Sequence, residues 1–318
     1  MRRIIDGHCD VISKLMMEPS LDFTNGGDGL DVTLTRLVQA GVLMQCFAIY
    51  LPQSIVEPQM GDLLKGADIF HNRIVADAGL KAIRTSNDLV EAARRQQPCA
   101  MLTVEGADAL NGNMDHLQTL FQLGVRALGL TWNYANWAVD GIGEPRNGGF
   151  TLKGRTLVKQ CNNLGILIDV SHLSVQGFWE LTELSDRPFI ASHSNVLELC
   201  GHRRNLNEQQ IRTIGERGGV IGINLFPPFL SSGNDASIEH IVAHIEKVCE
   251  WGGVHAAALG SDFDGIDQKV PGLENPAQLP NLLDALSKIF SDEQIERITY
   301  RNWYDFFVRE LPKTECYT

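Results

Sequence analysis

The most constraining feature of the sequence is a series of short apolar runs that recurs along its whole length. Each run ends on polar or glycine-containing residues. Several runs lack the polar alternation of a half-exposed strand, which is typical of strands covered on both faces in a parallel sheet. The pattern predicts eight strands, over residues 3–5, 42–50, 100–104, 125–130, 166–170, 188–191, 220–225 and 256–259.

Segments with helical periodicity separate these runs. In residues 60–78, for example, apolar side chains recur at mostly three- and four-residue spacings, and Gly79 follows as a stop signal. Near the C-terminus Ser291 is a candidate N-cap, with Gln294 in the capping-box position. We expect helices over residues 60–78, 152–164, 174–184, 208–215, 238–251, 276–290 and 292–309.

Eight strands alternating with helices in 318 residues predict an α/β fold, a single (β/α)₈ TIM-type barrel with C-terminal closing helices. An open doubly wound sheet is the alternative, but residues 6–11 after the first strand read DGHCDV rather than a glycine-rich dinucleotide fingerprint. No linker divides the chain, so we expect one domain over residues 1–318. The glycine-rich segments 24–30 and 138–150 are expected to be loops at the active face.

Charge and cysteine usage narrow the class of protein. Lys and Arg number 27 against 39 Asp and Glu, a net charge of −12, which argues against binding to nucleic acid or an anionic membrane. No stretch approaches the ~18 apolar residues of a membrane span, and the first residues lack a secretory apolar region. The seven scattered cysteines form no CxxC pair, which is typical of reduced thiols. We therefore expect a soluble, cytoplasmic protein.

Polar residues that could bind metal follow several of the predicted strands. After the first strand His8 and Asp10 project to the same side, because residues two apart in extended chain share a face, while Cys9 points away. In a barrel the carboxyl ends of all strands meet at one opening. The other candidates there are Glu105, His172, His193 and Asp262.

This set of imidazoles and carboxylates, without thiolates, suits a catalytic Zn²⁺ site. One ion needs only three protein ligands, so five or six candidates imply two ions that share a carboxylate and acidify a water between them. Each residue alone has an ordinary explanation, such as a hydrogen-bonded turn or a packed histidine. Asp6 is expected to hydrogen-bond locally or to support a metal ligand rather than bind metal, and Asp169 is expected to be structural. Six other histidines are expected to have surface or packing roles: His71, His116, His202, His240, His244 and His255.

Motifs along nearly the whole chain resemble the membrane (renal) dipeptidases, zinc metallopeptidases of the amidohydrolase-like barrel type. The resemblance implies hydrolysis of free dipeptides, with tolerance of a D-residue at the C-terminal position, by a metal-bridging hydroxide. It also implies a possible homodimer, whereas the expectation of no membrane or nucleic-acid partner rests on the acidic charge and the lack of apolar spans. The motifs are DGHCD at 6–10, VEG at 104–106, LTWNYANW at 130–137, IDVSH at 168–172, SHSN at 192–195, RRN at 203–205, GSDFDG at 260–265 and PGLEN at 271–275.

The resemblance also implies a role for each site residue. Asp262 corresponds to the aspartate that handles the proton of the bridging water, with Asp264 as its rival. Arg204 corresponds to the residue that binds the substrate carboxylate, with Arg203 as its rival. A guanidinium matches a carboxylate geometrically. The implied ligands are His8, Asp10 and Glu105 for one zinc, and Glu105, His172 and His193 for the second, with Glu105 bridging.

One position departs from the family pattern. Members commonly have a histidine where this chain has Trp132, and that histidine is thought to contact the oxygen of the tetrahedral intermediate. Either Trp132 or Asn133 donates in its place, or the zinc alone stabilises the oxyanion, or the substrate profile differs. Loss of one such donor typically costs ~10²–10³ in rate. Trp132 and Asn133 are therefore candidate substrate-binding residues.

Two other classes of function remain as alternatives. The first is a different binuclear hydrolase on the same barrel, such as a lactonase, deaminase or phosphotriesterase, although a modified lysine often bridges the metals in those sites. The second is a non-catalytic barrel that binds peptide or metal. All five expected ligand positions are occupied by ligand-type residues, which favours an enzyme.

Overall fold

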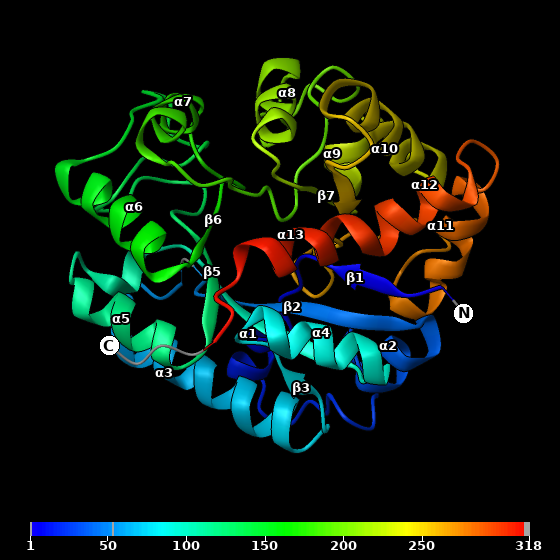
Figure 1. The fold of residues 1–318 in the computed structure, drawn as a ribbon, viewed down its shortest axis with the longest axis horizontal. Helices are drawn as coiled ribbons and strands as arrows, with labels where there is room; N and C mark the ends of the chain where they lie inside the picture. The colour runs from blue at the N-terminus through cyan, green and yellow to red at the C-terminus, as the bar shows by residue number, and fades with distance from the viewer. Residues whose placement is uncertain (1, 53, 315–318) are drawn as a thin grey trace.

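A curled parallel sheet lies at the centre of the computed structural model, which describes residues 2–52 and 54–314 (Figure 1). Its strands pair in the order β6-β5-β4-β2-β1-β8-β7, and β3 pairs with the start of β4. The α/β barrel class predicted from the sequence is confirmed. The strands are β1 Ile4–Asp6, β2 Val42–Tyr50, β3 Lys81–Ala82, β4 Cys99–Glu105, β5 Val125–Gly129, β6 Leu167–Asp169, β7 Ile221–Ile223 and β8 Ala257–Leu259.

The predicted sixth strand, residues 188–191, is wrong as a regular strand. It forms only two isolated parallel bridges, from Ile190 to Asp169 of β6 and from Ala191 to Ile221 of β7. Backbone hydrogen bonds on both sides accompany the bridges, including Ile190 N to Ile168 O at 3.0 Å. The segment therefore lies in the sixth place of the barrel and links β6 to β7. By contrast, the two-residue β3 was not predicted from the sequence.

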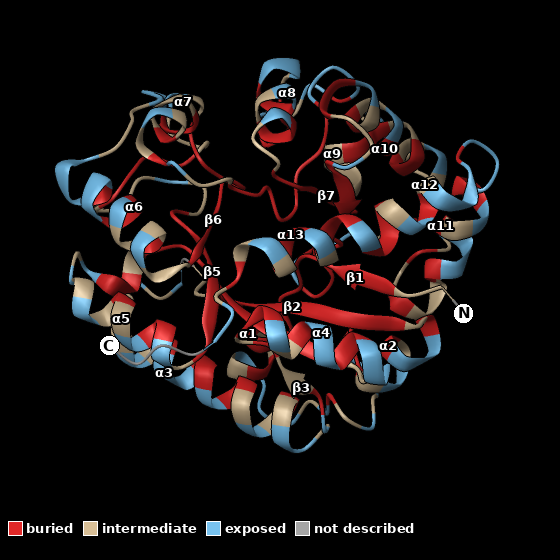
Figure 2. Ribbon diagram, viewed as in Figure 1, coloured by how far each residue is buried: buried red, intermediate tan, exposed pale blue. Residues whose placement is uncertain are grey.

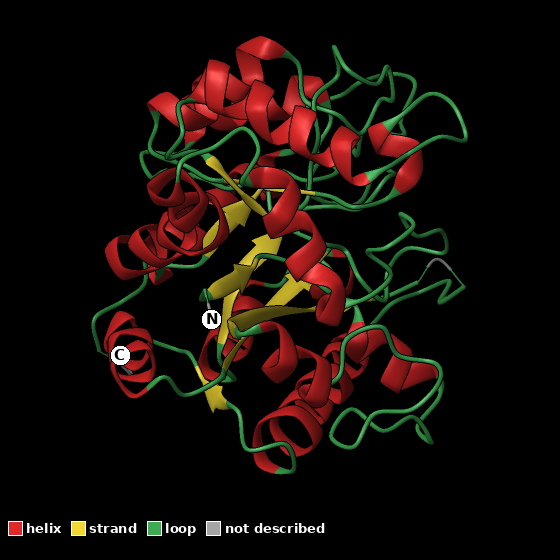
Figure 3. Cartoon of the chain, turned by 90° about the vertical axis from the view of Figure 1, so that its right-hand side faces the viewer, coloured by secondary structure: helices red, strands yellow, loops and turns green. Residues whose placement is uncertain are grey.

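Helices surround the sheet (Figure 3) and bury their inner faces against it, while their outer faces are exposed (Figure 2). Several predicted boundaries agree within two residues, and the Ser291–Gln294 capping box is present. The α-helices are α1 Val11–Met17, α2 Leu34–Ala40, α3 Met60–Ile69, α4 Ser86–Arg95, α5 Met114–Gln122, α6 Leu152–Leu164, α7 Val175–Leu184, α8 Glu208–Glu216, α9 Pro227–Leu230, α10 Ile238–Gly252, α11 Leu279–Leu286, α12 Asp292–Glu296 and α13 Asn302–Glu310.

Three predicted helices are interrupted. The helix expected over 60–78 changes at Phe70 to a π-helix, Phe70–Ala76, and the helix expected over 292–309 contains a π-helix at Arg297–Arg301. The helix expected over 276–290 begins as a 3₁₀ turn, Pro276–Gln278, before α11. Pro280 in the first turn of α11 explains that restart, since proline lacks the N–H that a continuous helix needs.

The C-terminal helix α13 lies across one end of the barrel (Figure 1). Its aromatic side chains Trp303, Phe306 and Phe307 form one buried cluster with residues of the strands. The indole N–H of Trp303 donates to the Leu259 carbonyl at 2.8 Å. A Cβ at Gly7 would lie 2.6 Å from that indole, so only glycine fits there. This packing leaves the opposite end of the barrel for the site.

Two further findings concern membranes and cysteines. Among the described residues, no helix has the length and apolar character needed to cross a bilayer. Six cysteines are free thiols and form no disulfide within the described part of the chain: Cys9, Cys46, Cys99, Cys161, Cys200 and Cys249. Cys316, the seventh, lies outside the described residues.

Candidate metal centre and active site

The five predicted metal ligands converge at the carboxyl ends of the strands. Glu105 is the last residue of β4, and His8 and Asp10 follow the end of β1. His8 lies beside Glu105. His172 follows β6, and His193 follows the bridging segment at Ala191. Their ligand atoms form two groups within 4.8 Å of one another, His8–Asp10–Glu105 and Glu105–His172–His193, and a third group joins Asp262 to His8 and His193. The first two are the ligand sets that the family resemblance implies.

Glu105 directs its two carboxylate oxygens toward different groups of side chains. Its Oε2 lies 3.5 Å from His8 Nε2, and that nitrogen lies 3.4 Å from Asp10 Oδ2. Its Oε1 lies 2.7 Å from His172 Nε2 and 3.5 Å from His193 Nε2. A carboxylate arranged in this way fits a bridge between two cations.

The chemistry of the residues fits a pair of divalent ions. Two buried ligand atoms, Nε2 of His8 and Oδ1 of Asp10, have no hydrogen-bond partner among the described residues. An unpaired buried polar atom is costly, and coordination to a cation would satisfy it. Imidazole nitrogens and carboxylate oxygens are ordinary Zn²⁺ ligands. The residues could thus hold one ion on each side of Glu105.

Mutual charge and burial shift the pKa values of these groups in opposite directions. Burial opposes a charge on His8, but the neighbouring carboxylates of Asp10 and Glu105 hold its pKa well above the usual value. Burial and the nearby Arg204 guanidinium lower the pKa of His172 to about 4. His193 likewise has a pKa well below its usual value because of burial and the charge on His8. Neutral imidazole is the form that binds metal.

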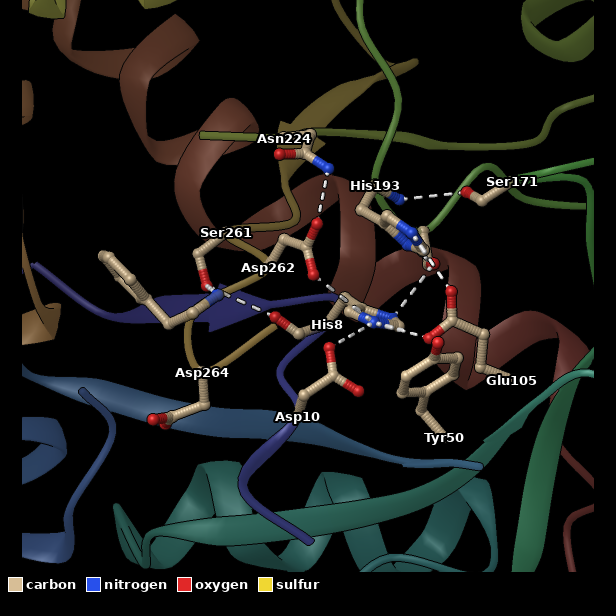
Figure 4. Close-up of polar contacts among 12 residues, drawn as sticks. His8, Asp10, Tyr50, Glu105, Ser171, His193, Asn224, Ser261, Asp262 and Asp264 are labelled. Carbon is tan, nitrogen blue, oxygen red and sulfur yellow. Dashed lines mark hydrogen bonds and ion pairs between the residues drawn. The ribbon is translucent and has the colours of Figure 1, made fainter. Parts of the chain in front are cut away.

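Asp262 faces the same cluster from the end of β8 (Figure 4). Its Oδ1 lies 3.9 Å from His8 Nε2, and its Oδ2 accepts a 2.8 Å hydrogen bond from Asn224 Nδ2. Burial, with the carboxylates of Asp10 and Glu105, raises the pKa of Asp262 to about 8. A carboxylate with such a pKa is suited to accept and return a proton near neutral pH.

The rival carboxylate, Asp264, points away from the cluster (Figure 4). It accepts hydrogen bonds from the backbone N–H groups of Asp31 at 2.7 Å and Val32 at 2.9 Å, and it pairs with Lys14 at 2.9 Å. Asp264 therefore anchors the chain that follows the glycine-rich 24–30 segment. Asp262 and Asp264 have similar left-handed φ values, +62° and +69°, so it is the direction of the side chain rather than backbone strain that distinguishes the two aspartates.

A cavity of about 220 Å³ opens onto the metal-ligand cluster, and Arg204 lies in its wall. The Arg204 side chain is buried and donates from Nη2 to the His193 carbonyl at 3.3 Å; its Nε has no partner among the described residues. Arg203, in contrast, is exposed and donates to the Gly143 carbonyl at 3.2 Å. Of the two arginines, only Arg204 is placed to meet a ligand in this cavity.

Trp132 and Asn133 also line the cavity, but in different ways. The indole ring packs between Tyr50 and His172, with ring centroids 5.3 Å and 5.7 Å away. Asn133 Oδ1 instead lies 2.9 Å from His172 Nδ1. A neutral His172 that offers Nε2 to a metal carries its proton on Nδ1, so Asn133 accepts that proton in a hydrogen bond and orients the ring.

Asp6, Asp169 and Cys9, which were not expected to bind metal, make hydrogen bonds or pack in the core. Asp6 accepts hydrogen bonds from the backbone and hydroxyl of Ser261, and Asp169 from those of Ser192. Cys9 is fully buried in the apolar core, and burial raises the pKa of its thiol well above the usual value. A neutral buried thiol is a poor nucleophile.

The other six histidines lie outside the three ligand groups. Five contact nearby backbone, as in His244 Nε2 to the Leu230 carbonyl at 3.1 Å, and the sixth, His240, caps α10 with Ser237. His202 accepts from the Arg204 backbone N–H and lies 4.5 Å from the Phe229 ring. The expectation of packing and surface roles agrees with these contacts.

The sequence interpretation missed several residues of the site. Tyr50, Phe226 and Phe229 line the cavity, and Asn224 holds Asp262. Tyr50 ends the second predicted strand and Asn224 lies near the end of the seventh, so the rule that located the metal ligands points to both. Phe226 precedes the short helix α9 and Phe229 lies within it, and the sequence offers no comparable signal for either residue.

Comparisons with known proteins agree with this geometry. Two solved structures have a closely similar fold. The first is a dipeptidase described as a metallopeptidase of family M19, with a TM-score of 0.91 and 28% sequence identity over 98% of this chain and 99% of that chain. The second is a metallopeptidase from Rhodobacter sphaeroides bound to a phosphinate mimic of the dipeptide L-Ala-D-Ala, with a TM-score of 0.90 and 26% identity over 98% of this chain and 99% of that chain.

Sequence relatives cover most of the chain as well. An uncharacterized protein of Klebsiella pneumoniae is 36% identical over 74% of this chain and 91% of its own length. An uncharacterized dipeptidase of Schizosaccharomyces pombe is 29% identical over 98% of this chain and 80% of its own length. The sequence profile of the membrane dipeptidases, peptidase family M19, matches residues 2–313. The chain therefore belongs to the membrane dipeptidase family of metallopeptidases.

Proposed function

We propose that this protein is a dipeptidase that hydrolyses the peptide bond of free dipeptides with two zinc ions bridged by Glu105. The observation that carries the proposal is the orientation of Glu105, whose two oxygens face two separate groups of ligand atoms. Family membership supports the peptidase chemistry, and the small cavity beside the cluster suits a substrate of two residues. The whole chain acts as one catalytic unit in this proposal.

When bound, two divalent ions supply an acidified water and polarise the scissile carbonyl. Asp262 accepts a proton from the attacking water and then returns it to the leaving amine. Asn224 holds the far oxygen of Asp262 at 2.8 Å, which leaves the near oxygen free for this transfer. Asn133 orients His172, and the Trp132 ring packs against the same imidazole.

Arg204 provides the carboxylate-binding end of the cavity in this mechanism. Its buried guanidinium has an unpaired Nε, and Phe229 lies against it with the Arg204 Cζ 5.5 Å from the ring centroid. A substrate carboxylate would satisfy the buried donor, and the ring would contact the C-terminal side chain. The Rhodobacter enzyme binds a mimic of L-Ala-D-Ala, which supports tolerance of a D-residue at the C-terminal position here.

Replacement of Arg204 with alanine is expected to raise KM for free dipeptides by about 10- to 100-fold, since a hydrogen bond to a charged group contributes roughly 1.5–3 kcal/mol. Steady-state kinetics on the zinc-loaded variant measure this change. Arg203→Ala is the control and keeps the wild-type KM, because its side chain is at the surface. An unchanged KM in Arg204→Ala would mean that another group binds the carboxylate.

A substrate screen with metal analysis tests the proposal as a whole. The zinc-replete protein is assayed against L,L and L,D dipeptides, C-terminally amidated dipeptides, a lactone panel and a phosphotriester. We expect release of free amino acids from dipeptides, loss of that activity on amidation, and two zinc ions per chain. Hydrolysis of lactones or phosphotriesters without dipeptide cleavage would favour another binuclear hydrolase. Cytoplasmic location and a homodimer stay predictions of the sequence.

A further inference from the structure

The hydroxyl of Ser192 lies between two of the histidine rings in the metal-ligand cluster. Its Oγ is 2.7 Å from Nδ1 of His193 and 3.4 Å from Nδ1 of His8. The two rings lie close together, with centroids 3.9 Å apart. In the proposed site these histidines bind different ions, so Ser192 contacts a ligand of each ion on the side away from the metals.

Asp169 determines how the Ser192 hydroxyl is oriented. Its Oδ1 accepts hydrogen bonds from the backbone N–H groups of Ser171 at 3.0 Å and Ser192 at 2.9 Å, and its Oδ2 accepts the Ser192 hydroxyl. An ionised carboxylate only accepts hydrogen bonds, so the serine must be the donor. All of these groups are buried.

The direction of this hydrogen bond constrains both imidazoles. A serine hydroxyl has one hydrogen, which goes to Asp169, and two lone pairs, which remain to accept hydrogen bonds. His193 and His8 must therefore each carry a proton on Nδ1. The Nε2 atom of each ring faces Glu105, at 3.5 Å in both cases, and His193 Nε2 also lies 3.0 Å from His172 Nε2. With the proton on Nδ1, the Nε2 lone pair of each ring is the one directed toward the proposed ions.

We propose that Asp169 and Ser192 are positioning residues that hold His8 and His193 in the orientation and tautomer required for metal binding. The inference rests on the proposed function and extends it, because a single hydroxyl supports both ion sites. Partners of this kind behind metal-binding histidines typically contribute a factor of 10–100 in metal affinity.

The chain contains a similar pair that provides a matched control. Asp6 accepts the hydroxyl and the backbone N–H of Ser261, at the end of the neighbouring strand. Ser261 Oγ lies near the backbone carbonyl of His8, at 3.2 Å, and contacts no imidazole nitrogen in the described structure. Ser261→Ala thus removes a buried serine–aspartate hydrogen bond without removing a partner of a histidine ring.

The test is the zinc affinity of the full chain, measured by chelator competition. We expect Ser192→Ala to weaken binding of both ions by about 10- to 100-fold. Ser192→Thr, which retains the hydroxyl, and Ser261→Ala are both expected to keep the wild-type affinity. Wild-type affinity in Ser192→Ala, or an equal loss in Ser261→Ala, would overturn the inference.

Asp169→Asn provides a second, nearly isosteric test. The asparagine oxygen still accepts the two backbone N–H groups, but its amide N–H now donates to Ser192, whose hydroxyl then donates to His193 Nδ1. We expect zinc affinity to fall as in Ser192→Ala, and the ¹⁵N resonances of the His193 ring to change from the Nδ1–H to the Nε2–H form.

The ring resonances separate this inference from the proposed function. A wild-type chain that binds no zinc yet shows Nδ1–H on His193 would contradict the proposed function and support the hydrogen-bond direction. Nε2–H on His193 in the wild-type chain would overturn the inference, whatever its zinc content.

Discussion

Glu105→Gln is expected to remove bound zinc and to lower dipeptidase activity by about a thousandfold or more. The amide replaces one acceptor oxygen with an N–H donor, which would face either His8 or the pair His172 and His193. At least one ion then loses its shared ligand, together with the several kcal/mol of transition-state stabilisation that metal ions supply. Zinc content by atomic emission and kcat/KM on a dipeptide measure the effect.

The matched control for this variant is Glu144→Gln. Glu144 lies in the loop that follows Trp132 and accepts a backbone hydrogen bond from Ala135 at 2.9 Å, a role that an amide oxygen also fulfils. We expect it to retain both zinc ions and wild-type kcat. A Glu105→Gln protein with two zinc ions and normal turnover would show that Glu105 does not bridge the ions.

Asp262→Asn is expected to retain both zinc ions and to lower kcat by about 10²–10⁴, the usual contribution of a general acid–base group. Asparagine keeps the shape of the side chain and accepts the Asn224 hydrogen bond through its oxygen. It neither accepts the proton of the attacking water nor returns one to the leaving amine. Single-turnover kinetics with metal analysis of the same sample separate loss of chemistry from loss of metal.

Asp264→Asn distinguishes between the two aspartates of the GSDFDG motif. Asp264 binds Lys14 and the backbone of Asp31 and Val32, away from the metal ligands. We expect the variant to unfold at a lower temperature while kcat stays near the wild-type value. Near-wild-type turnover by a metal-replete Asp262→Asn protein would remove Asp262 from the mechanism and reopen the assignment of the base.

The convergence of the candidate metal ligands was predictable because it depends on local sequence and a simple topological rule. Alternation along extended chain puts His8 and Asp10 on one side, and parallel strands carry their end residues to a common edge. Glu105, His172 and His193 follow from the same rule, although residues far apart in sequence must meet. The structure brings the ligand atoms of all five together, in two groups whose members lie within 4.8 Å of one another.

Other parts of the fold depend on contacts that a periodic pattern does not encode. Residues 188–191 were predicted as a strand from their apolar composition, yet only Ile190 and Ala191 make bridges to the neighbouring strands. The π-helices at Phe70–Ala76 and Arg297–Arg301 interrupt segments whose apolar spacing reads as continuous α-helix. In each case packing against neighbouring elements overrides the local pattern.

The sequence by itself determined the barrel class, the family and five candidate metal-ligand positions, because these depend on periodicity, strand ends and ordered motifs. The tertiary structure alone decided between rivals that are nearly adjacent in sequence: Arg204 faces the cavity and Arg203 the surface, while Asp262 faces the cluster and Asp264 a loop. It also decided the partners behind the ligands, Asn133 and Ser192. The physical reason is that hydrogen-bond direction and burial depend on which side chains meet across the barrel, and spacing along the chain does not specify those meetings.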